Sequence, residues 1–421
     1  MEIIKNPPHG QWPLLCERNQ ASDPQVEEAV TRIIADVRAR GDEALREYAA
    51  KFDGAKLTDI EVAQEEIDAA AAKVDPEVRL AIEAAIRNVR RFHQEQIPRR
   101  VDVEVMPGVR CVQKAVPIRR VGLYIPGGRA PLFSTVIMLA VPAELAGCSD
   151  VILCTPSRAP EILFTASRCG IRHIYAVGGA QAIAAMAYGT ASIGRRDKIF
   201  GPGNRYVTCA KQLVSRDVAI DMPAGPSEVL VMADDTADAR FVAADLLSQA
   251  EHGPDSQAIL VTNSERMAEK VSKQVDELKR QLNRVESVEG SLSHSRIVVF
   301  DYPDSMIEFV NTYAPEHLII SMKEPWKIAE RTTNAGSVFI GNYSPESAGD
   351  YASGTNHTLP TGGWAASMSG VNIDSFMHKV TYQDLTQQGI RALSKTITAM
   401  ARAEGLDAHA LAVKVRTDEP A

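Results

Sequence analysis

The sequence is poor in cysteine and has no excess of basic side chains. Its 421 residues include six cysteines without a C-x-x-C pair, and 46 basic against 54 acidic side chains give a net charge of −8. Scattered cysteines argue against a disulfide-built scaffold and suit free, mostly buried thiols in a reducing cytosol. The negative charge argues against nucleic acid or an anionic membrane as the main partner. We therefore predict a cytoplasmic protein without nucleic-acid or membrane partners.

Long apolar runs are also scarce. The first residues carry neither a basic nor an apolar stretch, so we expect no signal peptide. One uncharged stretch, 173–194, is long enough to imitate a membrane span, but it consists largely of Gly, Ala, Ser, Thr and Gln, and two glycines interrupt it. Apolar residues make up 45% of the chain, which is typical of a soluble globular protein. At roughly 100–200 residues per domain, the length suggests two to four domains.

The hydrophobic pattern divides the chain into four parts. The first hundred residues read as helical, because apolar residues recur there at helical spacing. From residue 118, short apolar runs are followed by glycines and then by helical segments, and this order repeats. Such repeats are typical of α/β folds with parallel sheets. We predict a helical N-terminal region, two Rossmann-like α/β domains and a helical C-terminal arm, at 1–117, 118–227, 228–378 and 379–421.

Three glycine-containing turns follow predicted strands in the first α/β domain, at 124–128, 178–181 and 201–204. Such turns let backbone N–H groups approach a phosphate at a helix N-terminus. None has the G-x-G-x-x-G pattern, since Tyr206 stands where the third glycine would be. Two interpretations stay open: a dinucleotide bound in a non-standard manner, or plain tight turns of a sheet. Arg129, after the first turn, would touch either cofactor or solvent.

The segment 245–255 places two potential ligands near the end of a predicted helix. Gln249 and His252 are three residues apart, so they share one face of that helix. A neutral imidazole and an amide oxygen can both bind a metal ion. The same residues could instead form an ordinary helix end, with Gly253 as the left-handed residue.

Three further segments carry polar groups outside any periodic pattern. Glu316 and His317 are adjacent after an apolar helix, and a carboxyl beside an imidazole can act on opposite sides of one substrate. Asp350 and His357 lie in a long loop, 343–370, that we expect to carry function because structureless loops of this length usually do. His409 follows a helix break in the tail. Taken alone, each of these groups could also be a solvated surface residue.

Six strings in this order resemble the histidinol dehydrogenase family, and the resemblance covers about residues 25–415. The strings are Val121-Gly-Leu-Tyr-Ile-Pro-Gly-Gly, Phe200-Gly-Pro-Gly-Asn, Asp221-Met-Pro-Ala-Gly-Pro-Ser-Glu, Ser248-Gln-Ala-Glu-His-Gly-Pro-Asp-Ser, Ala314-Pro-Glu-His-Leu and Ala348-Gly-Asp-Tyr-Ala-Ser-Gly-Thr-Asn-His. Six long matches in register are far more specific than one motif.

The resemblance implies a zinc-dependent enzyme that oxidises L-histidinol to L-histidine with two NAD+ and one water, in the final steps of histidine biosynthesis. It implies a homodimer in which the tail completes the partner's site. The implied residues are Gln249, His252, Asp350 and His409 as zinc ligands; Glu316 and His317 as the catalytic acid–base pair; Ser227, His317, His357 and Glu404, beside the zinc ligands, as substrate contacts; and Tyr124, Gln181 and Asn204 as NAD+ contacts.

The residue chemistry is compatible with these implied roles. Nitrogen and oxygen donors suit zinc, and a substrate with an imidazole and an amine can chelate the metal, which would then position the substrate. His317, with an ordinary pKa of ~6.5, is the candidate base for the hydroxyl proton. Glu316 is the candidate to activate the water that the aldehyde needs.

Three alternative functions are compatible with the sequence. One is a related zinc and NAD+ dehydrogenase that acts on another polar diol, although Glu404 would disfavour an anionic substrate. The second is a zinc hydrolase whose glycine turns bind a phosphate. The third is a catalytically silent binding protein.

Overall fold

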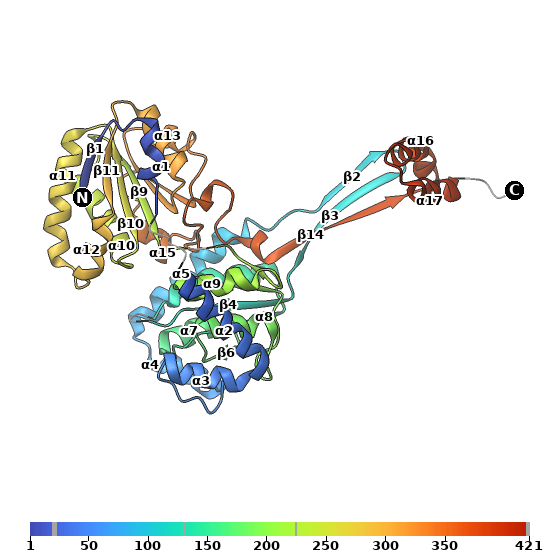
Figure 1. Cartoon of the computed structure of the whole chain (residues 1–421), viewed down its shortest axis with the longest axis horizontal. Coiled ribbons are helices and arrows are strands. Elements are labelled where there is room, and N and C mark those ends of the chain that lie inside the picture. The colour runs from blue at the N-terminus through green and yellow to red at the C-terminus, as the bar shows by residue number, and fades with distance from the viewer. Residues whose placement is uncertain (19–22, 129–130, 224, 418–421) are drawn as a thin grey trace.

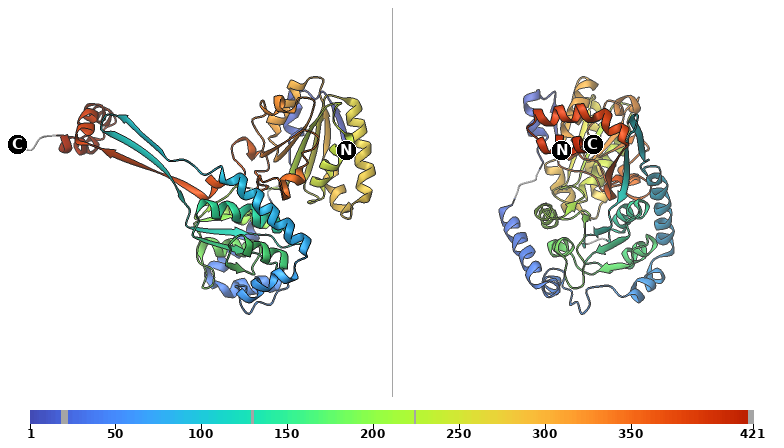
Figure 2. Two further views of the ribbon diagram at one scale, coloured as in Figure 1. Left: turned by 180° about the vertical axis from the view of Figure 1, so that it is seen from behind. Right: turned by 90° about the vertical axis from the view of Figure 1, so that its right-hand side faces the viewer.

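The structure, a computed structural model, describes residues 1–18, 23–128, 131–223 and 225–417. It consists of two α/β bodies and an arm that projects away from both (Figures 1 and 2). Each body has a parallel sheet with helices on both faces, and the arm ends in two helices beside the C-terminus. The prediction of two parallel-sheet α/β domains is therefore confirmed.

The first body is built on a five-stranded parallel sheet. The strands, in spatial order, are β6 (His173–Tyr175), β5 (Asp150–Cys154), β4 (Arg120–Tyr124), β7 (Lys198–Phe200) and β8 (Ala219–Ile220). One face packs against α2 (Pro24–Arg40), α3 (Asp42–Phe52), α8 (Gly179–Tyr188) and α9 (Arg205–Val214). The other face packs against α4 (Gln64–Lys73), α5 (Pro76–Gln94), α6 (Phe133–Ala146) and α7 (Pro160–Arg168).

The second body repeats this strand order and adds an edge strand. The order is β1 (Glu2–Lys5), β11 (Arg296–Val299), β10 (Gln257–Thr262), β9 (Glu228–Ala233), β12 (His317–Ser321) and β13 (Ser337–Ile340). One core contains α10 (Ala239–Ala250), α11 (Glu265–Leu278) and α12 (Val285–Ser293), and the other contains α1 (Trp12–Leu15) and α13 (Pro303–Tyr313). Short elements complete this body: η1 (His9–Gln11), η2 (Lys279–Gln281) and α14 (Pro325–Ala329).

The central strands have no polar alternation because both of their faces are covered. Every residue of β9 and of β10 is buried, which is typical of parallel strands between two helical layers. The uncharged stretch 173–194 is divided between β6, α8 and the segments around them. In the described part of the chain, none of the helices combines the length and the apolar character needed to cross a membrane.

The arm is an antiparallel sheet that joins distant parts of the chain. Its strands β2 (Val101–Met106) and β14 (Met377–Leu385) both pair with β3 (Val109–Pro117), and α16 (Gln387–Ala403) and α17 (Asp407–Thr417) follow. The hairpin lies in a region predicted as helical, and the helical prediction for the arm is also wrong for 379–385, which belong to β14. The residues that β14 pairs with lie 260 or more positions earlier in the chain, so no local sequence pattern could predict that pairing.

The loop predicted at 343–370 is only partly irregular. It contains the short helix α15 (Glu346–Tyr351) and the 3-10 turn η3 (Trp364–Ala366), and η4 (Ile373–Phe376) follows. The expectation of a structureless segment is therefore wrong for 346–351. Gly349, a poor helix former, lies inside this short helix, which explains why the sequence pattern did not predict it.

Candidate active site

The predicted site residues of the second body meet at the amino edge of its sheet. His317 is the first residue of β12, and Glu228 is the first residue of the neighbouring strand β9. Gln249 lies in the last turn of α10, and His252 follows that helix. A crossover helix runs back past its strand, so the C-terminal end of α10 returns to the amino edge. Segments distant in sequence therefore converge there.

Three side chains form a group that could hold a metal ion. One donor atom each from His252, Glu346 and Asp350 lies within 4.8 Å of the others. His317 Nε2 lies 3.9 Å from Asp350 Oδ1 and is a buried nitrogen without a hydrogen-bond partner in the described structure. Imidazole nitrogen and carboxylate oxygen are donors that suit zinc, so the residues present fit this metal.

Gln249 also belongs to this group. Its side chain is fully buried. In one carboxamide orientation both polar atoms of this side chain have hydrogen-bond partners. Nε2 then donates to the Glu346 carboxylate, and Oε1 accepts from the backbone N–H of Glu228 (3.1 Å). The fold therefore brings three of the four predicted metal ligands together, namely Gln249, His252 and Asp350.

Glu346 is a member of the site that the sequence analysis missed. It lies four residues before Asp350 in α15, so both carboxylates share one helix face. That spacing would have identified it if the segment had been predicted as a helix. The Glu346 side chain is almost fully buried, and its Oε1 lies 3.7 Å from His317 Nδ1.

The adjacent pair Glu316 and His317 is held by one backbone unit. The N–H of Glu228 donates to Glu316 Oε2 (2.8 Å), and His317 Nδ1 lies 3.1 Å from the Glu228 carbonyl oxygen. A carbonyl accepts only, so this contact assigns the proton of the neutral ring to Nδ1 and leaves Nε2 free to accept one. Although adjacent residues usually diverge, here both side chains are tied to the same strand.

Burial changes the protonation of this pair in opposite directions. It lowers the pKa of His317 to about 3 and raises the pKa of Glu316 well above its ordinary value. The ordinary imidazole pKa assumed from the sequence is therefore not retained, because the ring is desolvated. The imidazole is neutral throughout the physiological range, and burial makes the Glu316 carboxyl harder to ionise than an exposed one. Burial also raises the pKa of Asp350 to about 6.

The two other predicted substrate contacts of this body lie beside the group. His357 Nε2 is buried without a hydrogen-bond partner in the described structure, and burial lowers the pKa of His357 to about 4. The nearby His252 lowers it further. Ser227 immediately precedes β9, is half-buried, and accepts a backbone hydrogen bond from Gln257 (3.1 Å). His357 therefore belongs to the surroundings of the group, whereas the substrate-contact roles of both residues stay predictions.

Glu404 and His409 are not brought to this group by their own chain. Glu404 caps α16 and His409 lies in α17, and both are exposed on the arm, away from the two bodies (Figure 1). If these side chains act at such a site, the site must belong to another copy of the chain.

The three glycine turns of the first body converge on Tyr124, at the carboxyl edge of the sheet. The buried Tyr124 hydroxyl accepts a hydrogen bond from the Gly179 N–H (3.1 Å). Gly201 has φ +132, and a Cβ there would lie 2.1 Å from the Tyr124 carbonyl oxygen, so only glycine fits. Gln181 is buried in α8 close to Gly179. Arg129 lies outside the described residues.

Asn204 has a structural task as well as its predicted one. Its side-chain oxygen accepts hydrogen bonds from the N–H groups of Tyr206 (3.0 Å) and Val207 (3.2 Å), and so caps α9. The amide nitrogen is left to face solvent or a ligand. β4 and β7 neighbour each other at the point where the strand order reverses, which is the usual place for a ligand in open α/β sheets.

Replacing Lys211 with methionine is expected to destabilise the first body. Lys211 and Asp221 form an ion pair whose side chains are 4% and 1% exposed, and Lys211 Nζ donates to the Gly201 carbonyl (2.8 Å). Leaving a buried carboxylate unpaired typically costs about 3–5 kcal/mol. Urea unfolding measures this loss. The control Lys5→Met breaks an exposed pair with Glu265, worth about 0–1 kcal/mol, and equal effects of the two variants would contradict the expectation.

The fold and the site together define an α/β enzyme with a buried acid–base pair beside a group of potential metal ligands. Comparison with known proteins identifies its family. The family model described as Histidinol dehydrogenase matches residues 16–417. The chain therefore belongs to the histidinol dehydrogenase family and is an oxidoreductase.

Individual relatives agree over nearly the full length. A histidinol dehydrogenase of Bacteroides fragilis is 52% identical over 425 residues, covering 100% of this chain and 99% of the relative. One of Vibrio vulnificus is 52% identical over 395 residues, covering 93% and 92%. The crystal structure of histidinol dehydrogenase from Elizabethkingia anophelis superposes with a TM-score of 0.96 at 50% identity, covering 99% of this chain and 98% of that one.

Proposed function

We propose that this enzyme oxidises L-histidinol to L-histidine by way of L-histidinal, in the cytoplasm, as the last steps of histidine biosynthesis. The observation that carries the proposal is the free Nε2 of His317, a buried neutral imidazole beside His252, Glu346 and Asp350. Membership in the histidinol dehydrogenase family supports it.

Zinc is the proposed metal, with Gln249, His252, Asp350 and the partner subunit's His409 as ligands. Histidinol carries an imidazole and an amine, and bound zinc would supply a fixed anchor for both. Ser227 and His357, with the partner subunit's Glu404, complete the proposed substrate contacts. The Glu404 carboxyl can accept hydrogen bonds from a substrate that carries an amine and an imidazole and disfavours an anionic one, which favours histidinol over the alternative of another polar diol.

His317 is the proposed base in both oxidations. Its Nε2 takes the hydroxyl proton while hydride leaves the carbinol carbon for NAD+, which gives the aldehyde. In the second oxidation it takes a proton from the hydrated aldehyde while a second hydride leaves. The low pKa of the buried ring means that each proton passes on readily to solvent or to a neighbouring group.

Glu316 is proposed to activate the water that adds to the aldehyde. The carboxylate form of Glu316 removes one proton from water as the oxygen bonds to the carbonyl carbon. The Glu228 N–H, which donates to Glu316 Oε2, stabilises that form. Burial holds the aldehyde close to both groups, so a reactive intermediate is kept from bulk solvent.

The electron balance fixes the cofactor requirement. Conversion of a primary alcohol to a carboxylate removes four electrons and adds one oxygen from water. Each NAD+ accepts one hydride, which is two electrons, so two NAD+ are consumed and three protons are released. Tyr124, Gln181 and Asn204, at the carboxyl edge of the first sheet, are the proposed contacts for NAD+.

A homodimer with exchanged arms is the proposed assembly. Glu404 and His409 lie on an arm that reaches away from its own two bodies, which leaves the group of metal ligands incomplete within one chain. The arm also exposes apolar side chains such as Val105 (59%), Leu411 (57%) and Val415 (62%). Exposed apolar groups gathered on one projection are typical of an interaction surface.

Incubation of the purified enzyme with histidinol and excess NAD+ is expected to yield two NADH for each histidinol consumed. The NADH absorbance and the remaining histidinol measure this ratio. A metal chelator should abolish the signal, and zinc should restore it. A ratio of one would limit the activity to alcohol oxidation. Absence of NADH from histidinol, with turnover of a polar diol that lacks an imidazole, would favour the alternative dehydrogenase.

A further inference from the structure

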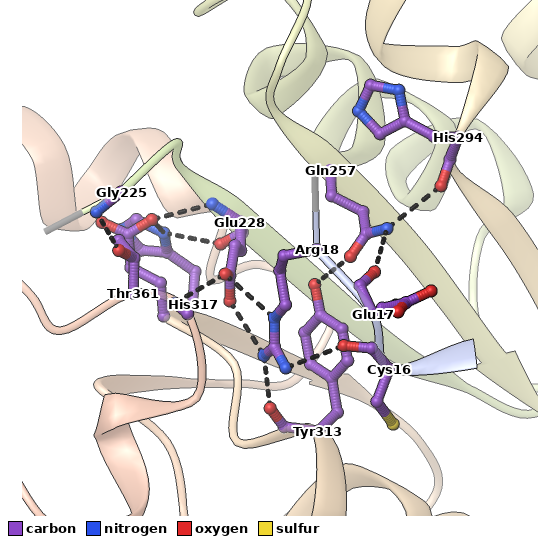
Figure 3. A network of polar contacts seen from close by, with 12 residues as sticks. Cys16, Glu17, Arg18, Gly225, Glu228, Gln257, His294, Tyr313, His317 and Thr361 are labelled. Carbon is purple, nitrogen blue, oxygen red and sulfur yellow. Dashed lines mark hydrogen bonds and ion pairs between the residues drawn. The ribbon is translucent and has the colours of Figure 1, made fainter. Parts of the chain in front are cut away.

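A largely buried ion pair lies next to the proposed catalytic residues. Arg18 Nε and Nη2 lie 3.1 and 3.2 Å from the two carboxylate oxygens of Glu228, and the two side chains are 14% and 1% exposed (Figure 3). Arg18 comes from the N-terminal segment after α1, whereas Glu228 begins the central strand β9. This pair therefore joins the start of the chain to the strand beside the site.

Glu228 is the residue whose main chain holds both Glu316 and His317. Its N–H donates to Glu316 and its carbonyl oxygen lies against His317 Nδ1, at the 2.8 and 3.1 Å given above. Its side chain also accepts a hydrogen bond from the Gly362 N–H (2.7 Å). Any rotation of Glu228 would consequently move the acid and the imidazole together.

Arg18 is itself fixed by its surroundings. Its guanidinium stacks 3.8 Å over the Tyr313 ring and donates to the carbonyl oxygens of Cys16 (3.0 Å) and Tyr313. The Tyr313 hydroxyl donates to Gln257 Oε1 (2.7 Å), and Gln257 Nε2 donates to the Glu17 carbonyl (3.4 Å). Figure 3 shows that these contacts form one continuous network from the N-terminal segment to His317.

Stability alone is a weak explanation for such a pair. Desolvation of two charges offsets much of their attraction, so a buried ion pair is often no more stabilising than well-packed apolar groups. A planar guanidinium that contacts both oxygens of a carboxylate does, however, fix the orientation of that carboxylate. Orientation matters here because Glu228 sets the position of both proposed catalytic groups.

We propose that Arg18 is a positioning residue that acts through Glu228 to hold Glu316 and His317 in their working geometry. The proposal rests on the roles given above to Glu316 and His317. Arg18 touches neither of them and contributes no proton. Its charge and planar shape keep the Glu228 carboxylate, and with it the Glu228 backbone, in one orientation.

The test compares Arg18→Lys and Arg18→Ala in the full-length zinc-loaded enzyme. A displacement of about 1 Å can lower kcat about 100-fold, so Arg18→Ala should lose about 10–100-fold in kcat while KM for histidinol changes little. Arg18→Lys keeps the charge without the planar fork and should lie between Arg18→Ala and the parent. Guanidinium chloride at low millimolar concentration should restore part of the kcat of Arg18→Ala.

Two controls separate positioning from folding and from the proposed chemistry. Arg158→Ala removes an arginine of an exposed pair with Glu66, remote from the site, and should leave kcat and guanidinium response unchanged. Zinc content and thermal unfolding are measured for every variant. Glu316→Gln and His317→Ala serve as references, and full activity in both would refute the proposed function instead.

The kcat of the Arg18 variants decides the proposal. A folded Arg18→Ala with reduced kcat, ordinary KM and recovery with guanidinium supports it. Unchanged kcat in a folded variant would overturn it, and so would a kcat loss that follows zinc content or melting temperature without guanidinium recovery. If Arg18→Ala does not fold, Arg18→Lys decides in its place: reduced kcat at ordinary KM and zinc content supports the proposal, and full kcat overturns it.

Discussion

Replacing His317 with alanine should remove both oxidation steps, with kcat falling by about 10²–10⁴-fold for histidinol and for histidinal alike. The reason is that one nitrogen, His317 Nε2, is proposed to take a proton in each step. Its Nδ1 is occupied by the Glu228 carbonyl, so the ring cannot simply turn and use the other nitrogen. Stopped-flow measurement of NADH from each substrate separates the two steps.

The matched variant Glu316→Gln should affect the steps unequally. A glutamine side chain keeps an oxygen that can accept from the Glu228 N–H, so the local structure should persist. It cannot remove a proton from water, and aldehyde oxidation should therefore fall further than alcohol oxidation. Equal losses in both steps for Glu316→Gln would show that the proposed division of roles is wrong.

Local sequence signals found the parts of this site that lie on regular elements. The helical spacing of Gln249 and His252 is a short-range pattern, and the fold confirms the helix that it predicts. The strand that begins at His317 was not predicted. Glu346 was missed because its short helix contains Gly349, a poor helix former, and was not predicted. Arg18 was missed for a stronger reason, since its partner Glu228 is 210 residues away and only the folded chain brings the two together.

The two bodies share one strand order, but their candidate binding residues lie at opposite edges of the two sheets. The glycine turns lie at the carboxyl edge of the first sheet, where ligands usually bind in open α/β sheets. Glu228 and His317 begin their strands, so the candidate acid–base pair lies at the amino edge of the second sheet. This edge is unusual for a site. It depends on the C-terminal end of α10 and on the α15 segment for its side chains.

Mixing two inactive variants, His252→Ala and His409→Ala, should restore activity if the arms are exchanged. In a heterodimer one site then combines both wild-type residues, and the other site carries both substitutions. With random pairing of equal amounts, about one quarter of the parental activity is expected, because half of the dimers carry one intact site. The chains are mixed in mild denaturant, refolded with zinc, and assayed for NADH formation.

A second mixture separates arm exchange from a general benefit of pairing. His252 and Asp350 belong to the same group within one chain, so a heterodimer of His252→Ala and Asp350→Ala has no intact site. This mixture should stay inactive. If it recovers as much activity as the first mixture, or if tagged heterodimers of the first pair remain inactive, the arm does not complete the neighbouring site. Recovery only in the first mixture requires His409 to act across the interface, because its own body lies too far from the arm to use it (Figure 2).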